Sequence, residues 1–150
     1  MNHYRAHGEN ILLTLWVGGL WFAGYVVAPV LFNVLDKSVA GEVAGKIFAV
    51  TSYIGIFCCT FLILSLLSNT KKNYRIGLLL VMLVIIIVGQ FVLSPMMTEL
   101  KLAGIDKGSD NAIQFGRLHG VSSLLYLANS LMGLVLVVAG LRPADALQGS

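Results

Sequence analysis

Residues Ile76–Met97 read IGLLLVMLVIIIVGQFVLSPMM and contain no Asp, Glu, Lys or Arg. About 20 apolar residues are enough to cross a hydrocarbon core of roughly 30 Å as a helix. The β-branched run Val84–Val88 would favour a strand in water. A bilayer offers the backbone no hydrogen-bond partners, however, so a spanning segment must be helical. This stretch therefore decides the fold class.

The rest of the chain has the same character. Of its 150 residues, 57% are apolar and only 11% are charged, and the mean hydropathy is +0.86, unlike a soluble domain. Three more uncharged stretches are Ile11–Leu35, Ile47–Leu67 and Leu118–Leu141. We expect one all-α transmembrane domain over residues 1–150, an integral membrane four-helix bundle with both termini on the same side. Its helices are predicted at about 11–35, 47–67, 76–97 and 112–141.

The loops carry the orientation signal. The first stretch is too long for a signal peptide, so we expect it to be retained. The two sides carry five Lys and Arg each, but three crowd into the seven-residue loop Asn69–Arg75. Under the positive-inside rule this density favours cytoplasmic termini, which we expect in a bacterial inner membrane. The net charge of +3 then fits the lipid bilayer as partner, with anionic headgroups and no nucleic acid.

A polar stripe opens the last apolar stretch. Its members are Arg117, His119, Ser122, Ser123, Tyr126 and Asn129. Most of them share one face of a helix with 3.6 residues per turn. Ionisable groups at a membrane boundary are costly and mark a site hypothesis. A ligand- or partner-binding site and a helix-packing interface built from small and hydroxyl residues both remain open.

Two prolines point to the same end of the bundle. Pro29 and Pro95 are expected to break the first and third helices, freeing the carbonyls of Tyr25 and Phe91. We therefore expect any pocket to open at this end, opposite the termini, and the other leaflet to be bland. The apolar stretches hold no acid, which argues against a proton relay built on buried carboxylates.

The longer loops also predict local structure. Asp36–Lys46 mixes small apolar and charged residues at helical spacing, which favours a short interfacial helix. Asn111–Gln114 has the pattern of a capping box, which would start the fourth helix about two turns before Leu118.

Metal and cofactor candidates are few. Met96, Met97 and His119 could offer soft ligands to copper(I). A haem needs an axial histidine, and His119 is the only histidine in the apolar stretches. Cys58 and Cys59 project about 100° apart on a helix and are expected to be apolar fillers. No nucleophile–base pair, phosphate loop or carboxylate dyad occurs, so we expect no enzyme activity and no cofactor.

Two tracts resemble a known family. The first tract consists of Trp16–Trp21, Ala28–Phe32 and Gly45–Phe48, and the second is Phe115–Ser123. Both are similar to the transmembrane protein 205 family, which includes small bacterial membrane proteins of unknown function. The resemblance marks His119, Gly120, Ser122 and Ser123 as the signature, with Trp16, Phe32 and Lys46. It implies a multipass membrane protein without assigned chemistry. The family often has Asn one turn beyond the serines, where this chain has Tyr126 and a displaced Asn129.

Two functions stay open at this point. The first is a non-enzymatic membrane protein whose His119 stripe binds a ligand or partner or packs helices. A transport role would require a homo-oligomer, for which Gly18 and Gly19 offer a small-residue face. The alternative is a haem- or copper-handling protein, because the first helix is distantly similar to copper-resistance D and protoporphyrinogen-oxidase-like proteins. Those proteins usually have a histidine where this chain has Glu9.

Overall fold

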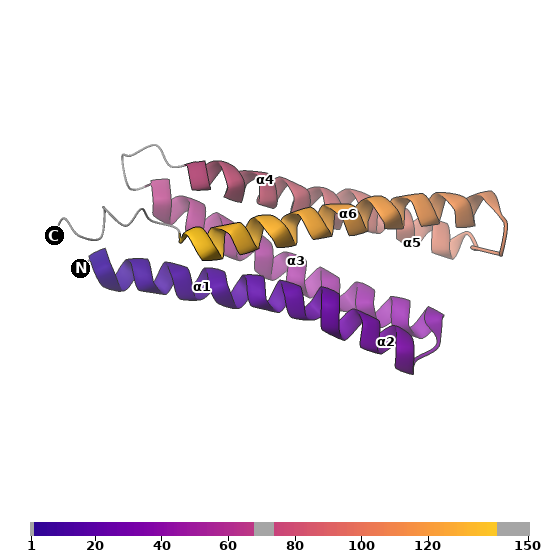
Figure 1. The fold of residues 1–150 in the computed structure, drawn as a ribbon. Coiled ribbons are helices and arrows are strands. Elements are labelled where there is room, and N and C mark those ends of the chain that lie inside the picture. The colour runs from indigo at the N-terminus through magenta and orange to yellow at the C-terminus, as the bar shows by residue number, and fades with distance from the viewer. Residues whose placement is uncertain (1, 68–73, 141–150) are drawn as a thin grey trace.

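The computed structural model describes residues 2–67 and 74–140, and the regular structure within these ranges is entirely helical. The elements are α1 (Asn2–Phe22), η1 (Ala23–Val27), α2 (Ala28–Val34), α3 (Lys37–Leu67), α4 (Tyr74–Val88), η2 (Gly89–Leu93), α5 (Ser94–Leu102) and α6 (Asp110–Ala139). They form four rods that are long and apolar enough to span a membrane: Tyr4–Val34, Lys37–Leu67, Tyr74–Leu102 and Asp110–Ala139. Figure 1 shows the rods side by side.

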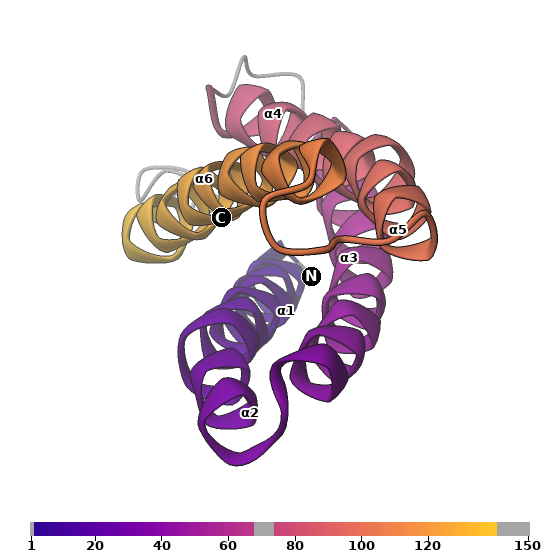
Figure 2. The same ribbon diagram turned by 90° about the vertical axis from the view of Figure 1, so that its right-hand side faces the viewer.

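The four rods form a ring. Viewed along the bundle, α1 lies between α3 and α6, and α4 closes the ring between α3 and α6 (Figure 2). Successive rods are antiparallel, so the described chain begins at Asn2 and ends at Gly140 at the same end of the bundle (Figure 1). The prediction of an all-α four-helix bundle is confirmed. Lys71, Lys72 and Arg142, which carried part of the orientation argument, lie outside the described residues.

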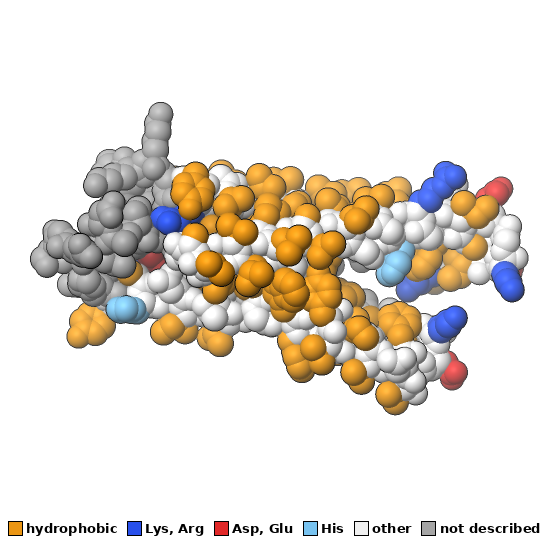
Figure 3. All heavy atoms as spheres, in the orientation of Figure 1, with side chains coloured by type: hydrophobic (Ala, Val, Ile, Leu, Met, Phe, Trp, Pro, Cys, Tyr) orange, Lys and Arg blue, Asp and Glu red, His pale blue; other side chains and the backbone are white. Residues whose placement is uncertain are grey.

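A narrow apolar core runs along the axis of the ring. Its buried members are Leu13, Trp16, Val17, Leu20, Cys58, Cys59, Leu62, Ile63, Leu66, Leu79, Met82, Ile86 and Leu136. The two cysteines are free and buried, as expected of apolar fillers. Large hydrophobic side chains also cover the outside, while charged side chains gather at the ends (Figure 3). An apolar exterior is what a bilayer requires, since lipid tails solvate it.

The rods extend beyond the uncharged stretches of sequence. The first begins early enough to include Arg5 and Glu9. The predicted interfacial helix at Asp36–Lys46 is wrong, because those residues from Lys37 onward are the first turns of α3. The fourth rod starts early, as expected, but its N-cap is Ser109, whose Oγ accepts from the amide of Ala112.

Pro29 and Pro95 each follow a π-helical segment. In each, the segment starts six residues before the proline, at Ala23 before Pro29 and at Gly89 before Pro95. The closing bonds run from Ala28 N–H to the Ala23 carbonyl and from Ser94 N–H to the Gly89 carbonyl. At each predicted break the rod therefore continues through a widened turn. Such π-bulges are one of the few causes of a helix kink.

The bundle has two unlike ends. At the end with Asn2 and Gly140, here called the closed end, all four rods lie together. Beyond the π segments, α2 packs on the start of α3 and α5 packs on the start of α6, and the two pairs diverge (Figures 1 and 2). We call this the open end; Figure 3 shows a notch there between two lobes.

Close packing of α6 on α1 depends on Gly133. A Cβ at Gly133 would lie 2.9 Å from Val17 Cγ2 and 3.3 Å from Met82 Cε. We expect Gly133→Leu to lower the free energy of unfolding by about 1–3 kcal/mol, the usual cost of overpacking. The measurement is thermal or SDS-induced unfolding in detergent. Gly120→Leu is the matched control, because Gly120 lies on the same helix with nothing within 4 Å of its Cβ position. Equal losses in both variants would contradict this packing.

Candidate functional site

The predicted polar stripe divides into an inner and an outer part. Asn129 and Ser130 are 3% and 0% exposed, and Tyr126 is half-buried. This part of α6 contacts α1, because the indole N–H of Trp21 donates to the Ser130 carbonyl at 3.2 Å. The Ser130 hydroxyl donates to the Tyr126 carbonyl of its own helix. The inner part of the stripe is thus a helix-packing interface.

Tyr126 lies at the kink of the first rod. Its hydroxyl donates to the Leu20 carbonyl at 2.5 Å. The backbone amide of Gly24 faces the phenol oxygen of Tyr126. Gly24 leaves room for the ring, because a Cβ there would collide with Tyr126 Cε1 and lie 3.0 Å from its oxygen. In a regular α-helix the Leu20 carbonyl would accept from the Gly24 amide. The phenol therefore bridges these two partners of a ladder position beside the π segment.

An aromatic cluster surrounds this hydroxyl and forms the floor of the open end. The Tyr126 ring lies 5.1 Å from the Phe48 ring of α3 and 6.2 Å from the Tyr25 ring. Tyr25 in turn lies 4.7 Å from Trp21. Aromatic contacts at such separations add to simple area burial. The cluster joins α1, η1, α3 and α6 at the point where the two pairs diverge.

The outer part of the stripe is exposed at the open end. Arg117, His119 and Ser123 are exposed, and Ser122 is half-buried. The Ser123 hydroxyl donates to the His119 carbonyl of its own helix at 2.8 Å. The His119 ring stacks on Phe115, with centroids 6.0 Å apart, and Lys101 Nζ lies 5.4 Å from the Phe115 centroid. The structure therefore brings an imidazole, an aromatic ring and a lysine together, on α5 and α6.

Met96 and Met97 lie on α5, where Met96 is 45% exposed and Met97 half-buried. Among the described residues, no group of three or more His, Cys, Asp and Glu side chains could hold a metal ion. A soft site formed by these methionines with His119 stays a prediction.

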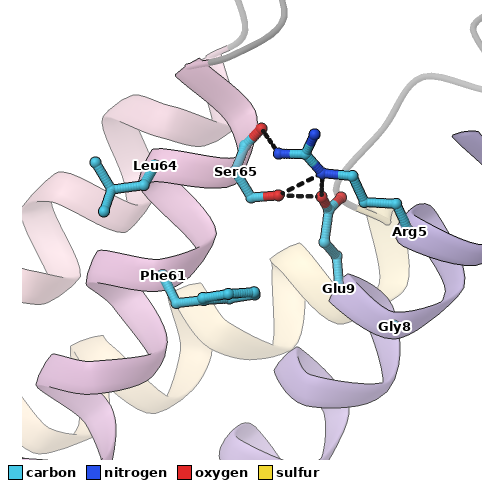
Figure 4. Close-up of a pocket in the computed structure, with 6 residues that line it drawn as sticks. All are labelled: Arg5, Gly8, Glu9, Phe61, Leu64 and Ser65. Carbon is cyan, nitrogen blue, oxygen red and sulfur yellow. Dashed lines mark hydrogen bonds and ion pairs between the residues drawn. The ribbon is translucent and has the colours of Figure 1, made fainter.

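A buried charged cluster lies at the closed end, where sequence reasoning expected a bland surface. The side chain of Glu9 is 2% exposed and forms an ion pair with Arg5, Nε to Oε1 at 3.3 Å. Ser65 of α3 donates its hydroxyl to the same carboxylate oxygen, and Arg5 donates to the Ser65 hydroxyl at 3.1 Å and carbonyl at 3.0 Å (Figure 4). The expectation that the spans hide no acid is wrong, because the first rod extends past Ile11 to include Glu9.

The same end holds further buried polar groups. Arg75, 8% exposed, donates to the carbonyl of Ala139 at the end of α6 at 3.1 Å. A cation there complements the carbonyls left unpaired at a helix C-terminus. Deeper in the bundle, Asn129 Oδ1 and Trp16 Nε1 are buried without a hydrogen-bond partner among the described residues.

An open pocket of about 660 Å³ adjoins the charged cluster. It is lined by Arg5, Gly8, Glu9, Phe61, Leu64 and Ser65, from α1 and α3 (Figure 4). The expectation that a pocket would open only opposite the termini is therefore wrong. A signal for it exists in the sequence: Glu9 falls on the 3.6-residue face that also carries Ala6, Leu13 and Trp16, all buried.

The role of the Tyr126 hydroxyl can be measured directly. We expect Tyr126→Phe to lower the free energy of unfolding by about 0.5–1.5 kcal/mol, because the Leu20 carbonyl loses a donor in an apolar surrounding. Unfolding in detergent gives the value. Ser123→Ala is the control, since its exposed hydroxyl bonds only within its own helix, and it should change stability by a few tenths of a kcal/mol at most. A Tyr126→Phe variant as stable as this control would rule out the proposed bridge.

Comparison with known proteins gives a family without an assigned activity. The family described as a domain of unknown function, DUF4149, matches residues 11–106. An uncharacterized protein of Aquifex aeolicus (strain VF5) is 30% identical over 123 residues, which cover 82% of this chain and 86% of that protein. No solved structure matches. The matched span covers most of the first rod, the whole second and third rods and both π segments. Of the closed-end cluster it includes Ser65 but neither Arg5 nor Glu9. On these two matches, this multipass membrane chain belongs to the DUF4149 family.

Proposed function

We propose that the protein is a non-enzymatic membrane protein that binds a partner or ligand at its open end. The observation that carries this proposal is the divergence of the α2–α3 pair from the α5–α6 pair above an aromatic floor. A bundle that served only to fill the membrane would gain by packing along its whole length. Here packing stops where the exposed part of the stripe begins.

The chemistry of the open end favours a partner with negative charge or hydrogen-bond acceptors. Arg117, His119 and Lys101 present donors, and Lys101 lies over the aromatic face of Phe115. The side chain of Lys101 also reaches toward α3, since its Nζ would lie 3.9 Å from a Cβ at Gly41. The ion pair between Glu42 and Lys46 at this end is exposed and lies within α3. Lys101 of α5 therefore reaches across the notch toward α3.

The membrane, the orientation and the oligomeric state are proposed from the sequence. We place the protein in the bacterial inner membrane with cytoplasmic termini, supported by the three cations crowded into loop 69–75. The open end then faces away from the cytoplasm. Kinship with the transmembrane protein 205 family rests on Trp16–Trp21 and on the His119 signature. Gly18 and Gly19 are exposed with nothing within 4 Å of their Cβ positions, which suits a homo-oligomer.

Site-specific photocross-linking tests the open end as a binding surface. A benzophenone amino acid at position 119 should yield one discrete adduct in native membranes, identified by mass spectrometry. The control position is 124, because Leu124 is 68% exposed on the same helix but turned about 140° away. Charge reversal by Lys101→Glu with Arg117→Glu should remove the adduct at 119.

Two results would contradict the proposed function. If position 119 captures only lipid, as expected for 124, the open end has no bound partner and the proposed function fails. If the adduct survives the charge reversal, the partner is not recognised by these cations and the proposed chemistry is wrong.

A further inference from the structure

We propose that the side chain of Lys101 is a strap that closes the notch at the open end by pairing with Glu42. Lys101 belongs to α5, whereas Glu42 lies near the start of α3, in the pair on the other side of the notch. Charged side chains of both signs lie at the tips of the two lobes (Figure 3). The strap needs no bound partner, so this inference does not depend on the proposed function.

The ammonium group of Lys101 lies between the two pairs. Its Nζ lies 5.4 Å from the centroid of the Phe115 ring on α6, within the range of a cation–π contact. Toward the other pair, the same Nζ would lie 3.9 Å from a Cβ at Gly41 of α3, and Phe32 Cζ of α2 would lie 4.0 Å from that Cβ. One flexible side chain of the third rod thus lies among groups from the other three rods.

The acid beside this ammonium group is Glu42, which follows Gly41 on α3. The charge of Lys101 acts on the Glu42 carboxylate across the notch. In the structure, Glu42 Oε1 accepts from Lys46 of its own helix at 2.8 Å. Lys101 itself forms no ion pair with the described residues. A carboxylate has more acceptor sites than one ammonium group fills, so Glu42 can pair with a lysine on its own helix or with one across the notch.

The helices that border the notch have room to move. Helix α2 follows the π segment η1 and α5 follows η2, so both begin at a widened turn. Such π-bulges interrupt the regular ladder and are sites of helix kinks. The buried apolar core lies on the closed side of both segments. A change in the two kink angles would therefore narrow or widen the notch without disturbing the core.

The two lysines define two states of the open end. With Glu42 on Lys46 the notch is open, as in the structure. With Glu42 on Lys101 the two pairs are drawn together, and the notch is narrower and less positive because an acid of the same chain neutralises Lys101. The side chains of Glu42 and Lys46 are 69% and 76% exposed, and exposed ion pairs are weak, so the two states can interchange.

Distances between spin labels across the notch test the strap. A label at Val34 reports the α2–α3 pair and a label at Ile113 reports the α5–α6 pair, and both positions are exposed. The protein is held in lipid nanodiscs, with Cys58 and Cys59 replaced by alanine because the chain has no other cysteine. A narrow population corresponds to the closed strap and a wide population to the open strap.

Three substitutions should change the ratio of these populations in opposite directions. Lys46→Met removes the competing lysine, so it should raise the narrow population about 1.5- to fivefold relative to the wide one, the effect of one exposed ion pair. Lys101→Met, which keeps an apolar stem on Phe115, and Glu42→Gln should each lower the narrow population by a similar factor. Lys107→Met is the matched control, because it removes an exposed cation from the loop between α5 and α6; it should leave the ratio unchanged.

The opposite signs separate a strap from a general loss of charge. If Lys46→Met and Lys101→Met shift the ratio in the same direction, or if neither differs from Lys107→Met, the proposal is overturned. At 1 M salt, where the Debye length is about 3 Å, the wild type and all variants should converge on the wide population. A narrow population that persists at this salt concentration would show that apolar contacts close the notch, which also overturns the proposal.

Discussion

The absence of hydrogen-bond partners in a bilayer is the constraint on which this structure depends. It forces helices on sequences whose β-branched runs would form strands in water. It also constrains the helices that contain Pro29 and Pro95. Pro29 and Pro95 cannot donate, yet both rods continue, because a π segment shifts the pairing register before each. Beside the first kink a neighbouring helix adds a donor, the Tyr126 hydroxyl, to the Leu20 carbonyl.

This arrangement gives the two ends of the bundle different properties. At the closed end, Glu9, Arg5 and Ser65 tie α1 to α3, and Arg75 ties α4 to the last carbonyls of α6. At the open end the helices are held only in pairs, and polar groups of the stripe are exposed. Tyr126 lies at the junction, in contact with the kink of the first rod and with Phe48 of α3. A kinked rod, rather than a loop, thus sets where the bundle opens.

The spans and their topology could be predicted because hydrophobic length is a local property of the sequence. The polar stripe on α6 could also be located from the sequence. Its division into a buried inner part and an exposed outer part could not be predicted. Tyr126 and His119 lie seven residues apart on similar faces, and only the kink of a distant helix makes one an interior donor and leaves the other exposed. The burial of Glu9 could not be predicted, because a charged residue ordinarily marks the limit of an apolar span. Its enclosure depends on Ser65, 56 residues away, a pairing that periodicity along one helix cannot show.

Distances between spin labels in lipid nanodiscs test the division into a closed and an open end most directly. With Cys58 and Cys59 replaced by alanine, one label pair at Ile11 and Val138 reports the closed end, and a second at Val34 and Ile113 reports the open end. All four label positions are exposed, so labels should not disturb the core. The account predicts a clearly longer mean distance for the second pair. Equal distances would show a bundle closed along its whole length and would contradict it.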